Sequence, residues 1–199
     1  MPSLFARYSD TDLRDLIAEN PLAWIVSPDP SVPALLMPLL LECDAQGAAV
    51  SLLGHIPRAH PLCTAFCDAG PIRFLFLGPN SYISPEFHSK ANWAPTWNFG
   101  SVEVAAEPHL DSALTDEALE RLVEHMEAGR RTPWTLDALG SRYEALRAGV
   151  IGFRASILGM TGRFKLGQDE SDDVFAEIMT ALEGRALKPW MERFNAARR

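Results

Sequence analysis

A series of short apolar segments separated by turn-forming residues fills the first 110 positions, and this series constrains the fold most. The connections between the segments are rich in turn formers, as in Pro28-Asp29-Pro30. Five or six short strands joined in this way favour a small antiparallel barrel over alternating βαβ units. The predicted strands lie at 22–27, 33–41, 49–56, 72–77 and from Thr96 to about Leu110.

Helical patterns replace the strand-like ones after residue 110. Apolar residues recur there at helical spacing, with capping residues and glycines at the expected ends. A single strand at 150–158 returns to the sheet. We therefore predict one α+β domain over residues 1–199, with most of the barrel in 1–110 and a helical supplement in 111–199. Helices are predicted to start at Ser9, Thr115, Thr132, Ser141 and Ser171, and a last one follows Pro189.

The acidic balance of the chain argues against direct binding to nucleic acid. Its 18 Lys and Arg face 26 Asp and Glu, which gives a formal net charge of −8. Residues 1–110 carry 5 basic and 11 acidic groups, and residues 111–199 carry 13 and 15. Proteins that bind DNA neutralise its phosphates with a basic stripe, and neither half of this sequence contains one.

No segment of the sequence is typical of secretion or membrane insertion. Residues 1–25 lack the basic and apolar regions of a signal peptide, and the longest apolar run, 35–41, is far shorter than the ~20 residues of a membrane span. Cys63 and Cys67 have no second pair with which to bind a metal, so we expect small buried side chains there. A cytoplasmic protein without a metal site is predicted.

The segment 78–99, with the sequence GPNSYISPEFHSKANWAPTWNF, combines aromatic, hydroxyl and cationic side chains. A planar, phosphorylated cofactor needs rings to stack on, hydroxyls and N–H groups for its phosphate oxygens, and a cation. The alternative is a long connecting loop packed by its own Phe87, Trp93 and Trp97. The residue pattern alone leaves both interpretations open.

Two further elements carry groups that suit a phosphate. The sequence GHIPRAHP at 54–61 places two histidines and Arg58 at a strand end, before a short predicted helix. His55 is alternatively an ordinary hydrogen-bonded residue of that strand end. The sequence GRFKLGQ at 162–168 is a basic turn, in which Arg163 and Lys165 are either solvated or, if the turn folds against the barrel, part of a phosphate clamp.

Together these motifs resemble those of the PaiB-like FMN-binding negative transcriptional regulators, a branch of the split-barrel flavoproteins related to pyridoxamine-phosphate oxidase. The most specific are GPxxYISP at 78–85 and PTWN at 95–98. The resemblance implies a split antiparallel β-barrel that forms homodimers and binds FMN at the dimer interface. The chain departs from the family's usual pattern at Leu35 and Leu36, where a polar pair is usual, and at Glu103, where a histidine is usual.

The resemblance also implies which residues contact the flavin. Three cations would bind the phosphate, two aromatic rings would contact the flavin ring, and hydroxyls would bind the ribityl chain or the phosphate. The phosphate-binding cations are Arg58, Lys90 and Lys165, and the aromatic residues are Tyr82 and Trp97. The full candidate set is His55, Arg58, Tyr82, Ser84, Lys90, Thr96, Trp97, Lys165 and Gln168.

Three functions are compatible with this sequence. The leading hypothesis is a dimeric FMN-binding protein of the negative transcriptional regulator type that acts without binding DNA directly. The second is a flavin-dependent oxidoreductase on a small substrate, in which the flavin carries the chemistry and His88 is the best candidate acid or base. The third is a barrel that has lost flavin binding and serves as an interaction protein.

Overall fold

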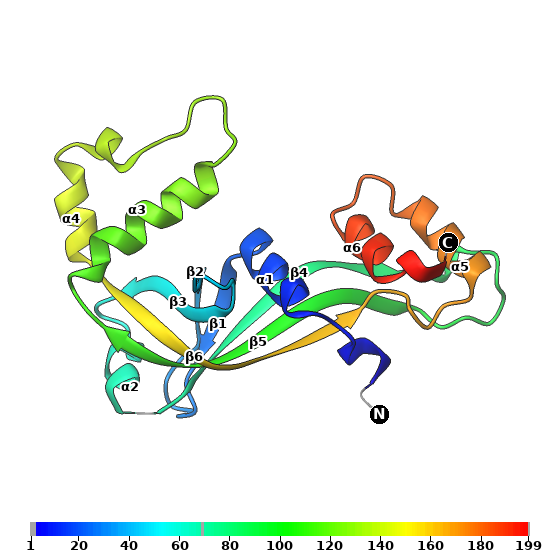
Figure 1. Ribbon diagram of the computed structural model, residues 1–199, viewed down its shortest axis with the longest axis horizontal. Helices are drawn as coiled ribbons and strands as arrows, with labels where there is room; N and C mark the ends of the chain where they lie inside the picture. The colour runs from blue at the N-terminus through cyan, green and yellow to red at the C-terminus, as the bar shows by residue number, and fades with distance from the viewer. Residues whose placement is uncertain (1–2, 69, 199) are drawn as a thin grey trace. The chain divides into compact units, whose positions relative to one another are not determined.

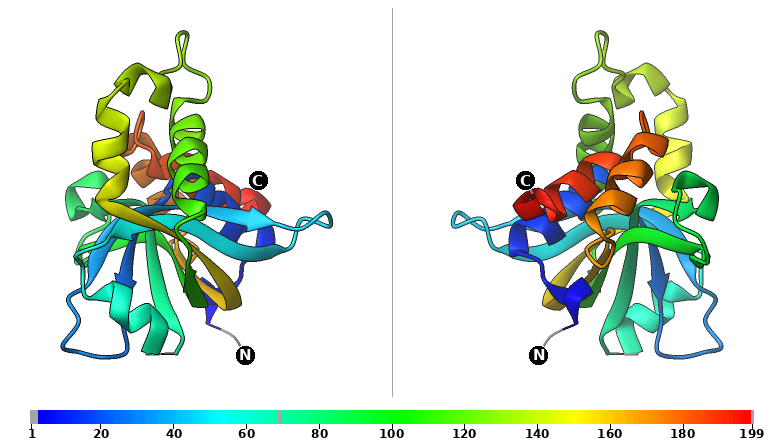
Figure 2. Two further views of the ribbon diagram at one scale, coloured as in Figure 1. Left: turned by 90° about the vertical axis from the view of Figure 1, so that its left-hand side faces the viewer. Right: turned by 90° about the vertical axis from the view of Figure 1, so that its right-hand side faces the viewer.

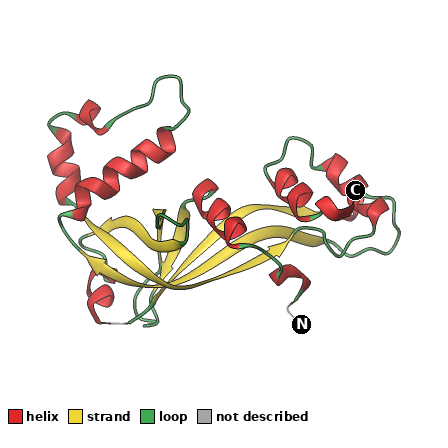
Figure 3. Cartoon of the chain, viewed as in Figure 1, coloured by secondary structure: helices red, strands yellow, loops and turns green. Residues whose placement is uncertain are grey.

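Six strands form a closed barrel in the computed structural model, which describes residues 3–68 and 70–198. The order around the barrel is β1-β2-β3-β6-β5-β4 (Figures 1 and 3). The β1–β2, β1–β4, β2–β3 and β3–β6 pairs are antiparallel. This topology confirms the predicted α+β barrel class. The strands are β1 (Leu22–Val26), β2 (Leu35–Cys43), β3 (Ala49–Pro57), β4 (Ile72–Ile83), β5 (Thr96–Leu110) and β6 (Val150–Lys165).

Helices precede the barrel, connect its strands and follow it. The α-helices are α1 (Asp10–Glu19), α2 (Leu62–Asp68), α3 (Leu114–Glu127), α4 (Arg142–Ala148), α5 (Asp172–Ala181) and α6 (Leu187–Phe194). Short 3-10 helices are η1 (Leu4–Ala6), η2 (Pro85–Phe87), η3 (Leu136–Leu139) and η4 (Ala196–Arg198).

The chain packs into two compact units. The terminal unit comprises the described residues of 1–20, 77–102 and 161–199, and the central unit comprises those of 21–76 and 103–160. The strands β4, β5 and β6 each contribute residues to both units. A single domain over residues 1–199 stays a prediction, and the two units are described separately below.

In the terminal unit, α1 begins where the sequence predicts it. Ser9 Oγ accepts a hydrogen bond from the Asp12 N–H at 3.2 Å, and the Asp12 carboxylate accepts from the Ser9 N–H at 2.7 Å, so both halves of a capping box are formed. Leu13, Leu16 and Ile17 lie on the buried face of the helix.

Helix α6 is joined to α1 by polar contacts within the same unit. Arg193 pairs with Asp12 and with Asp15 at 2.7 Å in each case, and the Trp190 indole donates to Glu19 Oε2 at 2.9 Å. Phe164 of β6 stacks on Phe194, with 4.7 Å between the ring centroids. These contacts fix α6 against the segment of β6 that ends at Lys165.

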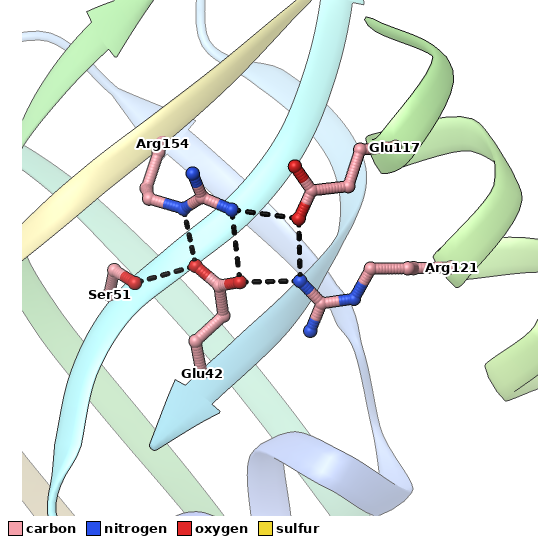
Figure 4. Close-up of polar contacts among 5 residues, drawn as sticks. All are labelled: Glu42, Ser51, Glu117, Arg121 and Arg154. Atoms are coloured by element: carbon pink, nitrogen blue, oxygen red, sulfur yellow. Dashed lines mark hydrogen bonds and ion pairs between the residues drawn. The ribbon is translucent and has the colours of Figure 1, made fainter. Parts of the chain in front are cut away.

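In the central unit, α3 is tied to the strands by a network of charged side chains (Figure 4). Glu42 of β2 accepts hydrogen bonds from Arg154 of β6 and from Arg121 of α3. Glu117 of α3 accepts from Arg121 at 3.0 Å and from Arg154 at 2.9 Å. Ser51 of β3 donates to Glu42 at 2.6 Å. Figure 2 shows the connection between α3 and α4 at the end far from the central-unit strands.

Several predictions of helix starts, strand ends and burial were wrong. Thr115 does not cap α3; it lies inside the helix, and its hydroxyl accepts from the Gly152 N–H at 3.1 Å. No helix starts at Thr132; the chain is irregular from there to the start of η3. Cys67 is exposed rather than buried, and Cys63 is half-buried. Two strands continue through residues that resemble turns, so β4 includes 78–83 and β6 includes 159–165.

Candidate functional site

A contact between Lys165 and Thr96 joins two segments that the sequence identified separately. Lys165 is the last residue of β6 and Thr96 is the first residue of β5. The Lys165 ammonium donates a hydrogen bond to the Thr96 hydroxyl, and it lies 5.9 Å from the centroid of the Phe5 ring. An ammonium group beside a hydroxyl is a donor set that suits a phosphate.

Gln168 shapes the turn that follows Lys165. Its Oε1 accepts from the Leu166 N–H and its Nε2 donates to the Phe164 carbonyl, both at 2.7 Å. Gly167 within this turn has a φ of 80°, a left-handed conformation that favours glycine. Because both ends of its amide bond the backbone, Gln168 positions Lys165, and its predicted contact with the cofactor stays a prediction.

Tyr82 and Trp97 form an exposed aromatic pair on the strands β4 and β5. Their ring centroids are 5.9 Å apart in an edge-to-face arrangement, and the two residues are 45% and 53% exposed. Exposed rings in contact offer an apolar surface to a planar ligand. Trp97 follows Thr96 directly in β5, and successive strand residues point to opposite faces of a sheet. The structure therefore brings Tyr82 to Trp97 and Thr96 to Lys165, but it does not place the two pairs on one face.

The loop from 88 to 95 carries Lys90 and is anchored on α5. The backbone N–H and the hydroxyl of Ser89 both donate to Glu177. The Lys90 ammonium lies 4.2 Å from the centroid of the Trp93 ring, and the His88 ring contacts the edge of the same indole. The Ser84 hydroxyl caps η2 by accepting from the Glu86 N–H at 3.2 Å. Ser84 thus shapes the start of the loop.

Glu170 is a residue of this region that the sequence analysis did not single out. It is 8% exposed, and its Oε2 has no hydrogen-bond partner within 3–68 and 70–198. Burial raises the pKa of its carboxyl and the nearby Asp169 raises it further, while His88, Lys165 and Lys90 oppose both. The carboxyl group therefore shares its surroundings with both predicted lysines. The sequence does contain a signal for Glu170: it lies five residues after Lys165, and the glycine between them allows the chain to turn back toward the lysine.

His55 and Arg58 belong to the central unit. His55 lies in β3, its Nδ1 has no partner in the described chain, and burial lowers the pKa of its imidazole. Arg58 follows β3, and its backbone N–H donates to the Gly149 carbonyl at 3.0 Å. Its exposed guanidinium acts electrostatically on the thiol of Cys63. His55 thus offers a ligand a neutral imidazole, whereas Arg58 offers it a cation.

The described part of the chain contains no group of three or more His, Cys, Asp or Glu arranged to hold a metal ion. None of its helices is long and apolar enough to cross a membrane. An open hollow of about 540 Å³ borders the anchored loop, and it is lined by Glu86, Phe87, His88, Ser89, Glu177, Thr180 and Ala181.

These groups suit FMN in their chemistry. Lys165 with Thr96, and Lys90 nearby, provide the cations and the hydroxyl that a phosphate monoester needs. Two buried atoms in the same unit, Glu170 Oε2 and His88 Nδ1, have no partner among the described residues, so they are available to a polar ligand. When bound, a flavin supplies hydride and electron transfer that no side chain here provides.

Comparison with known proteins identifies the family. Residues 1–158 match the family described as "Putative FMN-binding domain". The Bacillus subtilis protein named "Protease synthase and sporulation protein PAI 2" is 23% identical over 185 residues, which cover 92% of this chain and 88% of that protein.

Two solved structures share the fold. The flavocytochrome Anf3 from Azotobacter vinelandii has a TM-score of 0.59 at 18% identity, over 86% of this chain and 75% of that one. The FAD and heme binding protein from Mycobacterium smegmatis has a TM-score of 0.58 at 15% identity, over 85% and 78% of the two chains. The predicted split-barrel resemblance to PaiB-like flavoproteins is thereby confirmed, and the chain belongs to the family of FMN-binding domains, whose cofactor is a flavin.

Proposed function

We propose that this protein is a homodimeric, cytoplasmic FMN protein that regulates gene expression without contacting DNA itself. The contact between Lys165 and Thr96 carries the proposal, because it assembles phosphate-binding groups from two distant segments of a chain that belongs to an FMN-binding family. Membership of the family supports FMN as the cofactor, and the two side chains support this place as the binding site of its phosphate.

Nine residues take part in this proposal, in three roles. Lys165 and Lys90 of the terminal unit bind the phosphate, with the Thr96 hydroxyl beside Lys165; Arg58, in the central unit, stays a separate predicted phosphate contact. The exposed rings of Tyr82 and Trp97 contact the flavin ring. Ser84 and Gln168 shape the loop and the turn that present the lysines, and His55, in the central unit, stays a separate predicted contact.

An exposed apolar strip on the central unit supports the homodimer. Trp24 of β1 lies directly opposite Leu36 of β2 on one side and Leu75 of β4 on the other. Residues paired in this way point to the same face of the sheet, and all three are exposed. Leu22, two residues from Trp24, extends the strip. A contiguous exposed apolar surface is typical of an interface, and we assign it to a second copy of the chain.

The proposed regulatory role rests on the relative named for protease synthesis and sporulation, together with the charge of the chain. A net charge of −8 with no basic stripe repels DNA phosphates. We therefore propose that regulation acts through metabolism or through a partner protein. Direct operator binding at physiological salt would contradict this part of the proposal.

Titration of the purified apoprotein with FMN, followed by quenching of flavin fluorescence, tests the proposal. We expect binding, and we expect Lys165→Ala to weaken FMN by more than it weakens riboflavin, which has no phosphate. Lys188→Ala is the matched control, because Lys188 of α6 pairs with Glu183 and lies outside the candidate site. No binding at tens of micromolar FMN would refute the flavin function and favour a barrel that serves as an interaction protein.

The orientation of His88 favours a second candidate, a flavin-dependent oxidoreductase on a small substrate. Its Nδ1 is buried and unpartnered within the described chain, and its ring is held against Trp93, so it is placed to exchange a proton with a bound ligand. FMN-dependent consumption of NADH or NADPH under air that falls at least tenfold in His88→Ala would support this function. Absence of turnover with either nucleotide would exclude it in favour of the regulator.

A further inference from the structure

The turn between β6 and α5 holds Glu170 by its backbone while one side-chain oxygen stays unpaired. The Glu170 N–H donates to the Gly167 carbonyl at 3.2 Å, and its own carbonyl accepts from Arg198 at 2.6 Å. Arg198 also donates to the carbonyls of Gly167 and Gln168, so the turn is rigidly fixed. A buried carboxylate oxygen without a partner costs free energy, and such atoms mark places where a ligand or a proton belongs.

Charged groups from every neighbouring element act on this carboxyl. Lys165 comes from β6, His88 and Lys90 come from the anchored loop, and all three favour its ionised form. Asp169 of the same turn opposes ionisation. At the start of α5, Asp172 is neutralised by Arg198 at 3.0 Å, and Lys90 acts on Asp173. Glu170 is thus a buried acid near two lysines and one histidine, with three aspartates in the same segment.

The cations are held in place rather than free to move away. Ser89 is bound to Glu177 of α5 through both its N–H and its hydroxyl, and it lies between His88 and Lys90 in the chain. Lys165 is held by its hydrogen bond to Thr96. Lys90 and Lys165 both act electrostatically on the carboxyl of Glu170, so an anion that binds to the two lysines also interacts with that carboxyl.

We propose that Glu170 is a ligand-contacting residue of this site, and that it takes up one proton from solvent when an anionic group binds to Lys90 and Lys165, so that its Oε2–H donates to that anion. The inference rests on the proposed FMN function: it assigns Glu170 to the FMN site and couples the uptake of one proton to binding. The ligand class is a phosphate monoester, and the flavin ring plays no part in this step.

The physical reason is that an anion and an ionised carboxylate compete for the same two lysines. Once a phosphate neutralises Lys90 and Lys165, those cations no longer favour the ionised form of Glu170, while burial and the like charge of the phosphate disfavour it. A neutral carboxyl removes the repulsion and supplies a donor to a phosphate oxygen. Binding and protonation are therefore linked.

Calorimetric titration of the apoprotein at pH 8, in two buffers with different ionisation enthalpies, measures this proton directly. At that pH the FMN phosphate is already a dianion, since its second pKa is about 6, so its own titration contributes little. We expect net proton uptake with FMN and none with riboflavin. The affinity for FMN should also rise by up to tenfold for each unit by which the pH falls, over the range in which Glu170 titrates.

Glu170→Gln is the decisive variant, and Glu192→Gln, on the exposed surface of α6, is its matched control. We expect Glu170→Gln to abolish proton uptake and to tighten FMN binding at pH 8 about tenfold, because the amide cannot ionise. Unchanged proton uptake in Glu170→Gln, or FMN binding by the wild type without any uptake, would overturn the inference and leave the proposed function intact. Failure of the wild type to bind FMN would overturn both.

Discussion

Arg154 Nε donates a 2.7 Å hydrogen bond to Glu42 Oε2, and a second nitrogen of the same guanidinium reaches Glu117 Oε1 at 2.9 Å (Figure 4). One strand residue of β6 thus connects a half-buried carboxylate of β2 to helix α3. Because the Glu42 side chain is only 14% exposed, its charge must be matched inside the protein, and Arg154 and Arg121 do this together.

Replacing Glu42 by glutamine should destabilise the central unit. The amide keeps the size of the side chain but leaves Arg154 and Arg121 without their shared anion. Breaking a buried ion pair costs about 3–5 kcal/mol, and the partial exposure of the two arginines reduces the expected loss to about 2–3 kcal/mol. Urea unfolding measures this loss. Glu124→Gln, on the exposed part of α3, should change the free energy of unfolding by less than ~0.5 kcal/mol.

The same carboxylate predicts a pH dependence. Burial alone would raise the pKa of Glu42, but hydrogen bonds from Arg154, Ser51 and Arg121 outweigh it and lower the pKa to about 2. A lowered pKa means that the stabilisation is present above the ordinary glutamate pKa and is lost as the pH falls toward the folded-state value. The difference in unfolding free energy between wild type and Glu42→Gln should therefore be constant above pH 5 and shrink between about pH 4.5 and pH 2. A difference that stays constant down to pH 2 would contradict the assigned ionisation.

Gly152 allows the first turn of α3 to lie directly against β6. A Cβ at this position would lie 2.5 Å from the carbonyl carbon of Leu114 and 2.6 Å from the Thr115 nitrogen, both of which are backbone atoms. Gly152→Ala should cost at least ~3 kcal/mol, since backbone cannot move aside as a side chain can. Gly159→Ala, in the same strand but with no atom within 4 Å of a Cβ, is the matched control and should be neutral or slightly stabilising. Equal melting temperatures for the two variants would refute this packing.

The elements that the sequence predicted correctly are those whose signals are local. The capping box of Ser9 and Asp12 and the alternating burial of β1 depend on residues a few positions apart. Strand β4 was predicted too short because Gly78, Pro79 and Asn80 are typical of turns, although the barrel continues through them. The close approach of Leu16 to Gly78, which favours a residue without a Cβ there, comes from outside the strand.

The same distinction between local signals and contacts from distant residues applies to the candidate site. The side chains of the aromatic segment and of the basic turn were recognisable, and the contact between Thr96 and Lys165 follows once the strands pair. Glu170 is not among the predicted site residues, because the burial of its turn depends on Arg198, which donates to the Glu170 carbonyl from 28 residues away. A single sequence does not reveal that contact, since it is set by the packing of η4 on the turn.

The apolar strip predicts the effect of a charge on assembly. Trp24→Lys should convert the proposed homodimer to a monomer, because a lysine in the centre of the strip must be desolvated when the second copy binds. Light scattering coupled to size-exclusion chromatography measures the mass. Leu158→Lys, at another exposed apolar residue of the central unit, should leave the dimer intact. A wild-type chain that is monomeric at micromolar concentration would contradict the interface.

Glu170 also predicts how the apoprotein responds to pH before any ligand is added. Its pKa is raised by burial, so the folded state prefers the protonated carboxyl, and the stabilisation that protonation gives is lost as the pH rises through the folded-state value. Glu170→Gln should therefore melt at a higher temperature than the wild type at pH 8, by ~2–4 °C for each kcal/mol gained. The two melting temperatures should converge below about pH 4, as the carboxyl becomes protonated in both the folded and the unfolded wild-type chain. A lower melting temperature for Glu170→Gln at pH 8 would show that Glu170 is held as a stabilising anion by Lys90 and Lys165, and that the carboxylate is already satisfied without a ligand.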